Sequence, residues 1–183
     1  KSRQLPFRFY SAYTMMQEVS GAGSKVLGTV EKAMELSIAN LKPLSGRTII
    51  AIDTSGSMTF GTISAKSRVT PAEIASLLGI IAAKISDDAI VYTFDTSLKK
   101  HNISPNNTVL SQVKGMYGNG GGTKMGLPFE RAIRDKIVCD RFIVLSDNEV
   151  NSGWHDESKT IQGLADRYRS EMNNPDCWVH AID

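Results

Sequence analysis

An apolar run that ends at an aspartate constrains this chain more than any other segment. Residues 49–52 read Ile-Ile-Ala-Ile and lead directly into Asp53, which is followed by the hydroxyl side chains of Ser55 and Ser57. A continuous apolar run of this kind predicts a strand that is buried on both faces, as in parallel sheets. Open α/β sheets bind ligands beyond the carboxyl ends of their strands, so Asp53 lies where a ligand is expected.

The residue types after this strand indicate what the ligand is. One carboxylate and two hydroxyls lie within a single turn, and Gly56 lets the backbone bend between the serines. Such hard oxygen donors suit Mg²⁺ or Mn²⁺, and Ca²⁺ also takes oxygen ligands. The segment therefore predicts a site for a divalent cation.

The pattern Asp53-x-Ser55-x-Ser57 resembles the metal-ion-dependent adhesion site of von Willebrand factor A domains. That family has two further ligands, and both have counterparts here: Thr123 after the glycine-rich run 118–122, and Asp147 at the end of the predicted buried strand 142–147. The resemblance covers residues 46–183. It implies a metal held by these five residues, with an open coordination position that an acidic side chain of a partner fills.

Other interpretations of these segments fit less well. An aspartyl-phosphate enzyme needs a second acidic residue two positions after the nucleophile, where this chain has Ser55. A glycine-rich loop can hold a phosphate through its backbone N–H groups. A P-loop, however, requires Gly-Lys-Ser/Thr, and the order here is Gly122-Thr123-Lys124.

Two more acidic residues are candidates for a supporting role around the metal. Asp95 ends another predicted strand at the same sheet edge, so it could reach the metal region, or it could simply start the turn 95–97. Glu149 could contact the ion through water or orient a ligand. We rank Glu149 below Asp147, and Asn148 below both.

Alternating apolar patterns and turn signals predict a doubly wound, mostly parallel α/β sheet with helices on both faces, preceded by N-terminal helices. Thr70 and Glu73 form a capping box that opens a helix with Pro71 at its first position. The predicted strands cover 47–53, 89–94, 99–103, 142–147 and 177–182, with a turn at Asp87-Asp88, and the other predicted helices cover 25–41, 107–116, 124–136 and 156–172.

The N-terminal segment, residues 1–45, is predicted to be separate from the A-like domain at 46–183. The aromatic and basic stretch 5–13 is compatible with an amphipathic docking helix. Together with Ser146-Asp147-Asn148-Glu149 and the Asp-x-Ser-x-Ser-Met start, it also resembles the Ro autoantigen (TROVE-module) family. In that family an A domain closes a ring of helical repeats, so residues 1 to about 40 would be the last helices of the ring.

The Ro resemblance implies binding of small noncoding (Y-type) or misfolded RNA, mainly through a basic ring that lies outside this chain. A formal net charge of +2 over 183 residues neither requires nor excludes nucleic acid, although Lys99, Lys100, Arg131, Arg134 and Arg141 could form a local patch. Two alternatives are a generic A domain that binds a protein partner through its metal, and a metal-dependent enzyme. No motif orients any of the three histidines as a general base, which argues against an enzyme.

Composition adds expectations about the setting. Two cysteines, Cys139 and Cys177, imply no disulfide framework and favour a reducing, cytoplasmic compartment. No apolar run approaches the length of a membrane span, so no membrane is expected as a partner. The chain starts with Lys1 and shows no signal peptide, and we expect it to be a piece of a longer protein.

Overall fold

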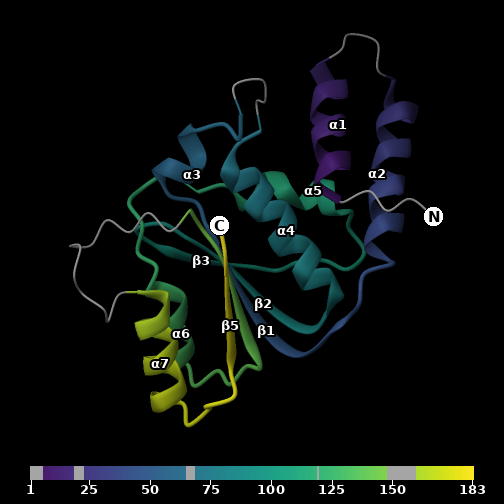
Figure 1. The fold of residues 1–183 in the computed structure, drawn as a ribbon. Helices are drawn as coiled ribbons and strands as arrows, with labels where there is room; N and C mark the ends of the chain where they lie inside the picture. The colour runs from purple at the N-terminus through teal and green to yellow at the C-terminus, as the bar shows by residue number, and fades with distance from the viewer. Residues whose placement is uncertain (1–5, 19–22, 65–68, 119, 148–159) are drawn as a thin grey trace.

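A five-stranded sheet forms the centre of the computed structural model, which describes residues 6–18, 23–64, 69–118, 120–147 and 160–183 (Figure 1). The strand order is β3-β2-β1-β4-β5. The neighbouring pairs are parallel except β2 and β3, which are antiparallel. The strands are β1 (Leu44–Asp53), β2 (Ser86–Phe94), β3 (Leu98–His101), β4 (Arg141–Leu145) and β5 (Trp178–Ile182).

Helices cover both faces of this sheet, as predicted. In Figure 1, α3, α4 and α5 lie on one side of the sheet and α6 and α7 on the other, while α1 and α2 stand beside α4. The helices are α1 (Pro6–Glu18), α2 (Ser24–Ile38), α3 (Gly56–Phe60), α4 (Pro71–Ile85), α5 (Val109–Val113), α6 (Leu127–Arg134) and α7 (Ile161–Glu171), with a 3-10 turn at Lys114–Met116.

Two apolar clusters separated by the sheet form the core. On the α4 side, Ile50 and Ile52 pack with Leu77 and Ile80 of that helix. On the opposite side, Ile49 and Ala51 belong to a cluster that includes helical residues of α6 and α7. Alternate residues of β1 thus enter different clusters, which explains why this strand is apolar without interruption.

Most element predictions are confirmed, with several boundaries shifted. The capping box at Thr70 and Glu73 is present and opens α4. The predicted helix 107–116 divides into α5 and the 3-10 turn, and 124–136 shortens to α6, whose first turn contains Pro128. α7 begins at Ile161 after the cap residue Thr160, and residues 156–159 of its predicted start lie outside the described residues.

The turn predicted at Asp87-Asp88 is wrong, because both aspartates lie within β2. β1 starts early, at Leu44, and pairs there with Ser86, which keeps the following residues extended. The aspartates are satisfied in this position: Asp88 forms an ion pair with Arg47, and Asp87 accepts a hydrogen bond from Gly46 N–H. Pairing with a neighbouring strand has overridden the turn preference of the Asp-Asp pair.

Candidate metal site

Asp53 ends β1 at the carboxyl edge of the sheet, between two neighbouring strands. It pairs with Phe94 of β2, and the preceding Ile52 pairs with Leu145 of β4. The Asp53 side chain is fully buried. Its Oδ1 accepts a hydrogen bond from Ser55 N–H (2.8 Å), and its Oδ2 accepts one from Ser146 Oγ (2.6 Å). The carboxylate therefore has a fixed orientation.

The turn after Asp53 leads into a short helix that carries the two serines. Ser55 occupies the N-cap position of α3, but its hydroxyl makes no capping hydrogen bond. Instead, Ser55 Oγ lies 3.4 Å from Ser57 Oγ. Ser55 is buried, whereas Ser57 is exposed, so the pair of hydroxyls connects the buried carboxylate with the surface. The short helix α3 was not predicted from the sequence.

The glycine-rich loop is fastened to this turn through its backbone. Gly121 O accepts a hydrogen bond from Gly56 N–H (2.8 Å), and Asp95 O accepts one from Lys124 N–H (2.9 Å). These two contacts bracket Thr123, whose side chain is nearly buried. Thr123 thus lies between the loops that follow β1 and β2.

Asp147 follows β4 and is half-buried. Its charge acts on Asp53: burial raises the pKa of the Asp53 carboxyl, hydrogen bonds from Ser146 and Ser55 oppose that shift, and Asp147 raises it further. The net direction is upward. Two carboxyl groups this close disfavour each other's charge, and a bound cation would relieve that repulsion.

The supporting residues have different outcomes. Asp95 starts a turn, because its Oδ1 accepts hydrogen bonds from Ser97 N–H (2.7 Å) and Ser97 Oγ (2.9 Å). That contact agrees with the simpler of the two predicted roles. Glu149 and Asn148 lie outside the described residues. From the sequence, Ser146 was noted only as part of the segment Ser146-Asp147-Asn148-Glu149, and its hydrogen bond to Asp53 was not predicted.

The donor set at this edge fits a hard cation. Among the described residues, no three His, Cys, Asp or Glu side chains group as a metal site, so any ion here would need hydroxyl ligands as well. Adjacent oxygen ligands lie about 3 Å apart around Mg²⁺ and about 3.4 Å apart around Ca²⁺, from the usual metal–oxygen distances. The separation of 3.4 Å between the serine hydroxyls is close to both values.

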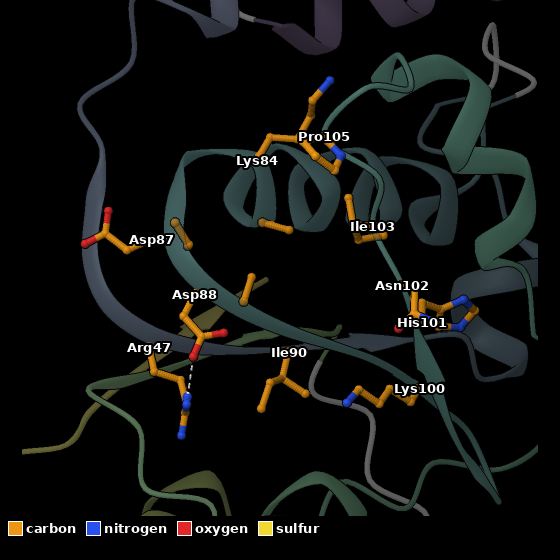
Figure 2. A pocket seen from close by; sticks show the side chains of 13 residues that line it. Arg47, Lys84, Asp87, Asp88, Ile90, Lys100, His101, Asn102, Ile103 and Pro105 are labelled. Atoms are coloured by element: carbon orange, nitrogen blue, oxygen red, sulfur yellow. Dashed lines mark hydrogen bonds and ion pairs between the residues drawn. The ribbon is translucent and has the colours of Figure 1, made fainter.

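An open pocket of about 580 Å³ lies away from the candidate metal site, between the end of α4, the start of β2 and the segment after β3 (Figure 2). Figure 2 shows the ion pair of Arg47 with Asp88 on one side and Lys100 with His101 on the other. The pocket contains none of the candidate metal ligands. Its charges are mixed, so it does not form a basic patch.

The sheet order, the covered faces and the aspartate at the strand edge define an α/β domain of the von Willebrand factor A type. A family model described as "Ro60 vWA domain" matches residues 47–179. The chain therefore belongs to the Ro60 vWA-domain family.

A curated protein and a solved structure from Deinococcus radiodurans are both similar to this chain. The curated protein "RNA-binding protein RO60" is 31% identical over 147 residues, which is 77% of this chain and 28% of that protein. The crystal structure of the Ro (RSR) protein matches with a TM-score of 0.73 at 26% identity and covers 97% of this chain and 37% of that one. This chain thus spans 28% of the curated protein and 37% of the chain in the crystal structure. Within its described residues, no helix is long and apolar enough to cross a membrane.

Proposed function

We propose that this chain is the metal-binding A domain of a Ro-type ribonucleoprotein and that its metal mediates binding of a partner. The ion is Mg²⁺, with Ca²⁺ or Mn²⁺ as alternatives. Ser55, Ser57 and Thr123 would hold it directly, and Asp53 and Asp147 directly or through water. The observation that carries the proposal is the pair of serine hydroxyls, 3.4 Å apart, beside a buried carboxylate oriented from both sides.

The chemistry of this donor set favours binding of an anionic group. The three hydroxyls that would bind the ion directly carry no charge. Where Asp53 and Asp147 contact the ion only through water, its charge is not neutralised by direct ligands and can attract an anionic group. Because Ser57 is exposed, the open side of the proposed site would face the surface. An acidic side chain of a partner protein would complete the coordination.

A catalytic role has less support in this arrangement. His101 lies opposite Val91 in the sheet, and His180 lies opposite Ile143. Both imidazoles are therefore within strands rather than at the carboxyl edge beside Asp53, while His155 is outside the described residues. Because neither described histidine lies at the proposed ion, we propose that the domain is not an enzyme.

We infer RNA binding by analogy with the relative named an RNA-binding protein. We assign this binding mainly to a helical ring in the part of the parent protein beyond this chain, which would bind small noncoding or misfolded RNA. Residues 1–45 would be the end of that ring. The arginines considered for a local patch are engaged within the domain. Arg131 and Arg134 pair with Asp135, and Arg141 donates hydrogen bonds to Ser45 O and Thr48 Oγ1. We therefore expect weak RNA binding by this chain at physiological salt.

The test is a comparison of the wild type with Asp53→Asn. Asparagine keeps the shape of this fully buried side chain, and it removes the charge that a cation needs. At Mg²⁺ concentrations of about 100 times Kd, mass action should stabilise the wild type by about 2.7 kcal/mol and the variant hardly at all. Calorimetric titration with Mg²⁺ and Ca²⁺ measures the binding directly.

Asp176→Asn provides the matched control, because it removes an exposed carboxylate just before β5, at the opposite edge of the sheet. It should bind Mg²⁺ like the wild type. Absence of Mg²⁺ and Ca²⁺ binding by the wild type would refute the proposed metal site. A Mg²⁺-dependent phosphatase or nuclease turnover, lost in Asp53→Asn, would instead favour the enzyme alternative.

A further inference from the structure

The two N-terminal helices are fastened to the A-like domain by specific polar contacts as well as by apolar packing. Met34 and Ile38 of α2 belong to the same core cluster as α4. On the same helix, Glu35 accepts a hydrogen bond from Val109 N–H (2.7 Å) and pairs with Lys84 (2.9 Å). These contacts fix α2. The other helix, α1, packs against the same cluster through Tyr10 and also contacts another carboxylate.

That carboxylate is Glu73, in the first turn of α4, where three segments of the chain meet. Its Oε1 accepts hydrogen bonds from Tyr10 Oη of α1 (2.9 Å) and from Tyr117 Oη (3.0 Å). Its Oε2 accepts one from the backbone N–H of Thr70, the cap residue of α4 (2.8 Å). A single side chain thus joins α1, the start of α4 and the segment before the glycine-rich loop.

Both phenols are held as hydrogen-bond donors. Tyr10 is almost completely buried. Burial, followed by the charge of Glu73, raises the pKa of Tyr10 far above its ordinary value, and the same causes raise the pKa of Tyr117 to about 12. Both hydroxyls stay protonated and donate to the same oxygen, Glu73 Oε1. Movement of either hydroxyl therefore changes the hydrogen bonding of the other.

Tyr117 directly precedes the loop that carries Thr123, and the start of this loop packs closely against Thr54, the residue after β1. A Cβ built on Gly118 would lie 2.2 Å from Thr54 Oγ1 and 2.9 Å from Thr54 O. Three residues later, Gly121 O is hydrogen-bonded to Gly56 N–H. A shift of Tyr117 would therefore move the start of the loop relative to the turn after β1.

We propose that Glu73 is a positioning residue that couples docking of α1 to the placement of the glycine-rich loop. The consequence for the ion rests on the proposed metal site, because Thr123 belongs to this loop. If docking of α1 strengthens ion binding, then ion binding strengthens docking of α1 by the same factor, because such coupling is reciprocal. The helices that precede the A-like domain would thereby influence its metal site.

The test uses the full chain and backbone hydrogen exchange without added metal. Tyr10→Phe removes only the hydroxyl on α1. The Gly56 amide donates to Gly121 O of the loop, and the Lys124 amide donates to Asp95 O after β2. Hydrogen exchange at both amides should accelerate by about fivefold, the low end of typical coupling. The reciprocal variant, Tyr117→Phe, should accelerate exchange within α1. Tyr13→Phe is the control on the same helix, because no hydrogen bond of its hydroxyl is found among the described residues.

The results separate this inference from the metal site itself. Unchanged Gly56 and Lys124 exchange in Tyr10→Phe, or unchanged α1 exchange in Tyr117→Phe, would overturn the coupling whether or not the chain binds an ion. Calorimetry with Mg²⁺ then tests the consequence for the metal. Tyr10→Phe should weaken binding about fivefold relative to Tyr13→Phe. A wild type that binds no Mg²⁺ would refute the proposed site and leave the exchange result to decide the coupling.

Discussion

Replacement of Gly118 by alanine tests how tightly the glycine-rich loop is held against the strand-end turn. The added Cβ would lie 2.2 Å from Thr54 Oγ1, 2.5 Å from Thr54 Cβ and 2.9 Å from Thr54 O. Thr54 cannot easily move away, because it is buried and its N–H and hydroxyl both donate to Phe94 O (2.9 and 3.2 Å). The loop must shift instead, and overpacking of this kind costs about 1–3 kcal/mol.

Urea unfolding without metal measures this cost, and calorimetry with Mg²⁺ measures its effect on the site. We expect Gly118→Ala to lower the unfolding free energy by about 1–3 kcal/mol and to weaken Mg²⁺ binding as Thr123 is displaced. Gly115→Ala is the matched control, since a Cβ there meets nothing within 4 Å. Equal stabilities for the two variants, within about 0.5 kcal/mol, would show that the loop adapts and that the close contact does not constrain it.

Three other predictions concern the rest of the sheet. Tyr168→Phe should lower the free energy of unfolding in urea by about 2–4 kcal/mol. The Tyr168 hydroxyl accepts a hydrogen bond from Cys139 N–H (3.1 Å) and donates one to Ile137 O (2.8 Å), and both groups would lose their partner. A loss below about 0.5 kcal/mol would contradict this. Burial lowers the pKa of His101 below 6.5, so stability should fall as pH drops from 6.5 towards that pKa, and His101→Gln should flatten the dependence; equal slopes for wild type and variant would refute it. Cys139 and Cys177 are free and buried, so a thiol reagent should modify neither in the native protein and both in denaturant, and rapid labelling of the native protein would show that this end of the sheet opens.

The sequence places the candidate metal-site residues at one edge of the sheet because each follows a strong local signal, while their binding of a metal stays a prediction. Asp53 directly follows an apolar run, and Asp147 follows another after the single residue Ser146. Parallel strands bring such ends to one edge of the sheet. Thr123 follows a glycine run that favours a loop. The site therefore depends on short segments whose type and order are visible in the chain, although the distances within it are not.

Features that depend on contacts distant in sequence could not be predicted in the same way. Asp87 and Asp88 favour a turn by composition, and only the pairing of Ser86 with Leu44 keeps them extended. Ser146 is an ordinary strand-end residue until its hydroxyl is seen to orient Asp53. The contact of Tyr10 with Glu73 joins residues 63 positions apart, and no periodicity in either helix indicates it.

The parts of the candidate site differ in how firmly they are held, and this decides where an ion would act. Asp53 ends the central strand β1, and Ser146 directly follows the neighbouring strand β4. Both side chains are buried. Among the described residues, two backbone hydrogen bonds attach the loop that carries Thr123 to the strand-end turns. Local stability follows such differences in burial and bonding, so the loop should open more readily than the strands. We therefore expect Mg²⁺ to slow hydrogen exchange mainly at Gly56 and Lys124, with little change at the β1 amides, which are already held by pairing on both sides. Equal protection of the strand and the loop by Mg²⁺ would contradict this and would indicate that the ion stabilises the domain only as a whole.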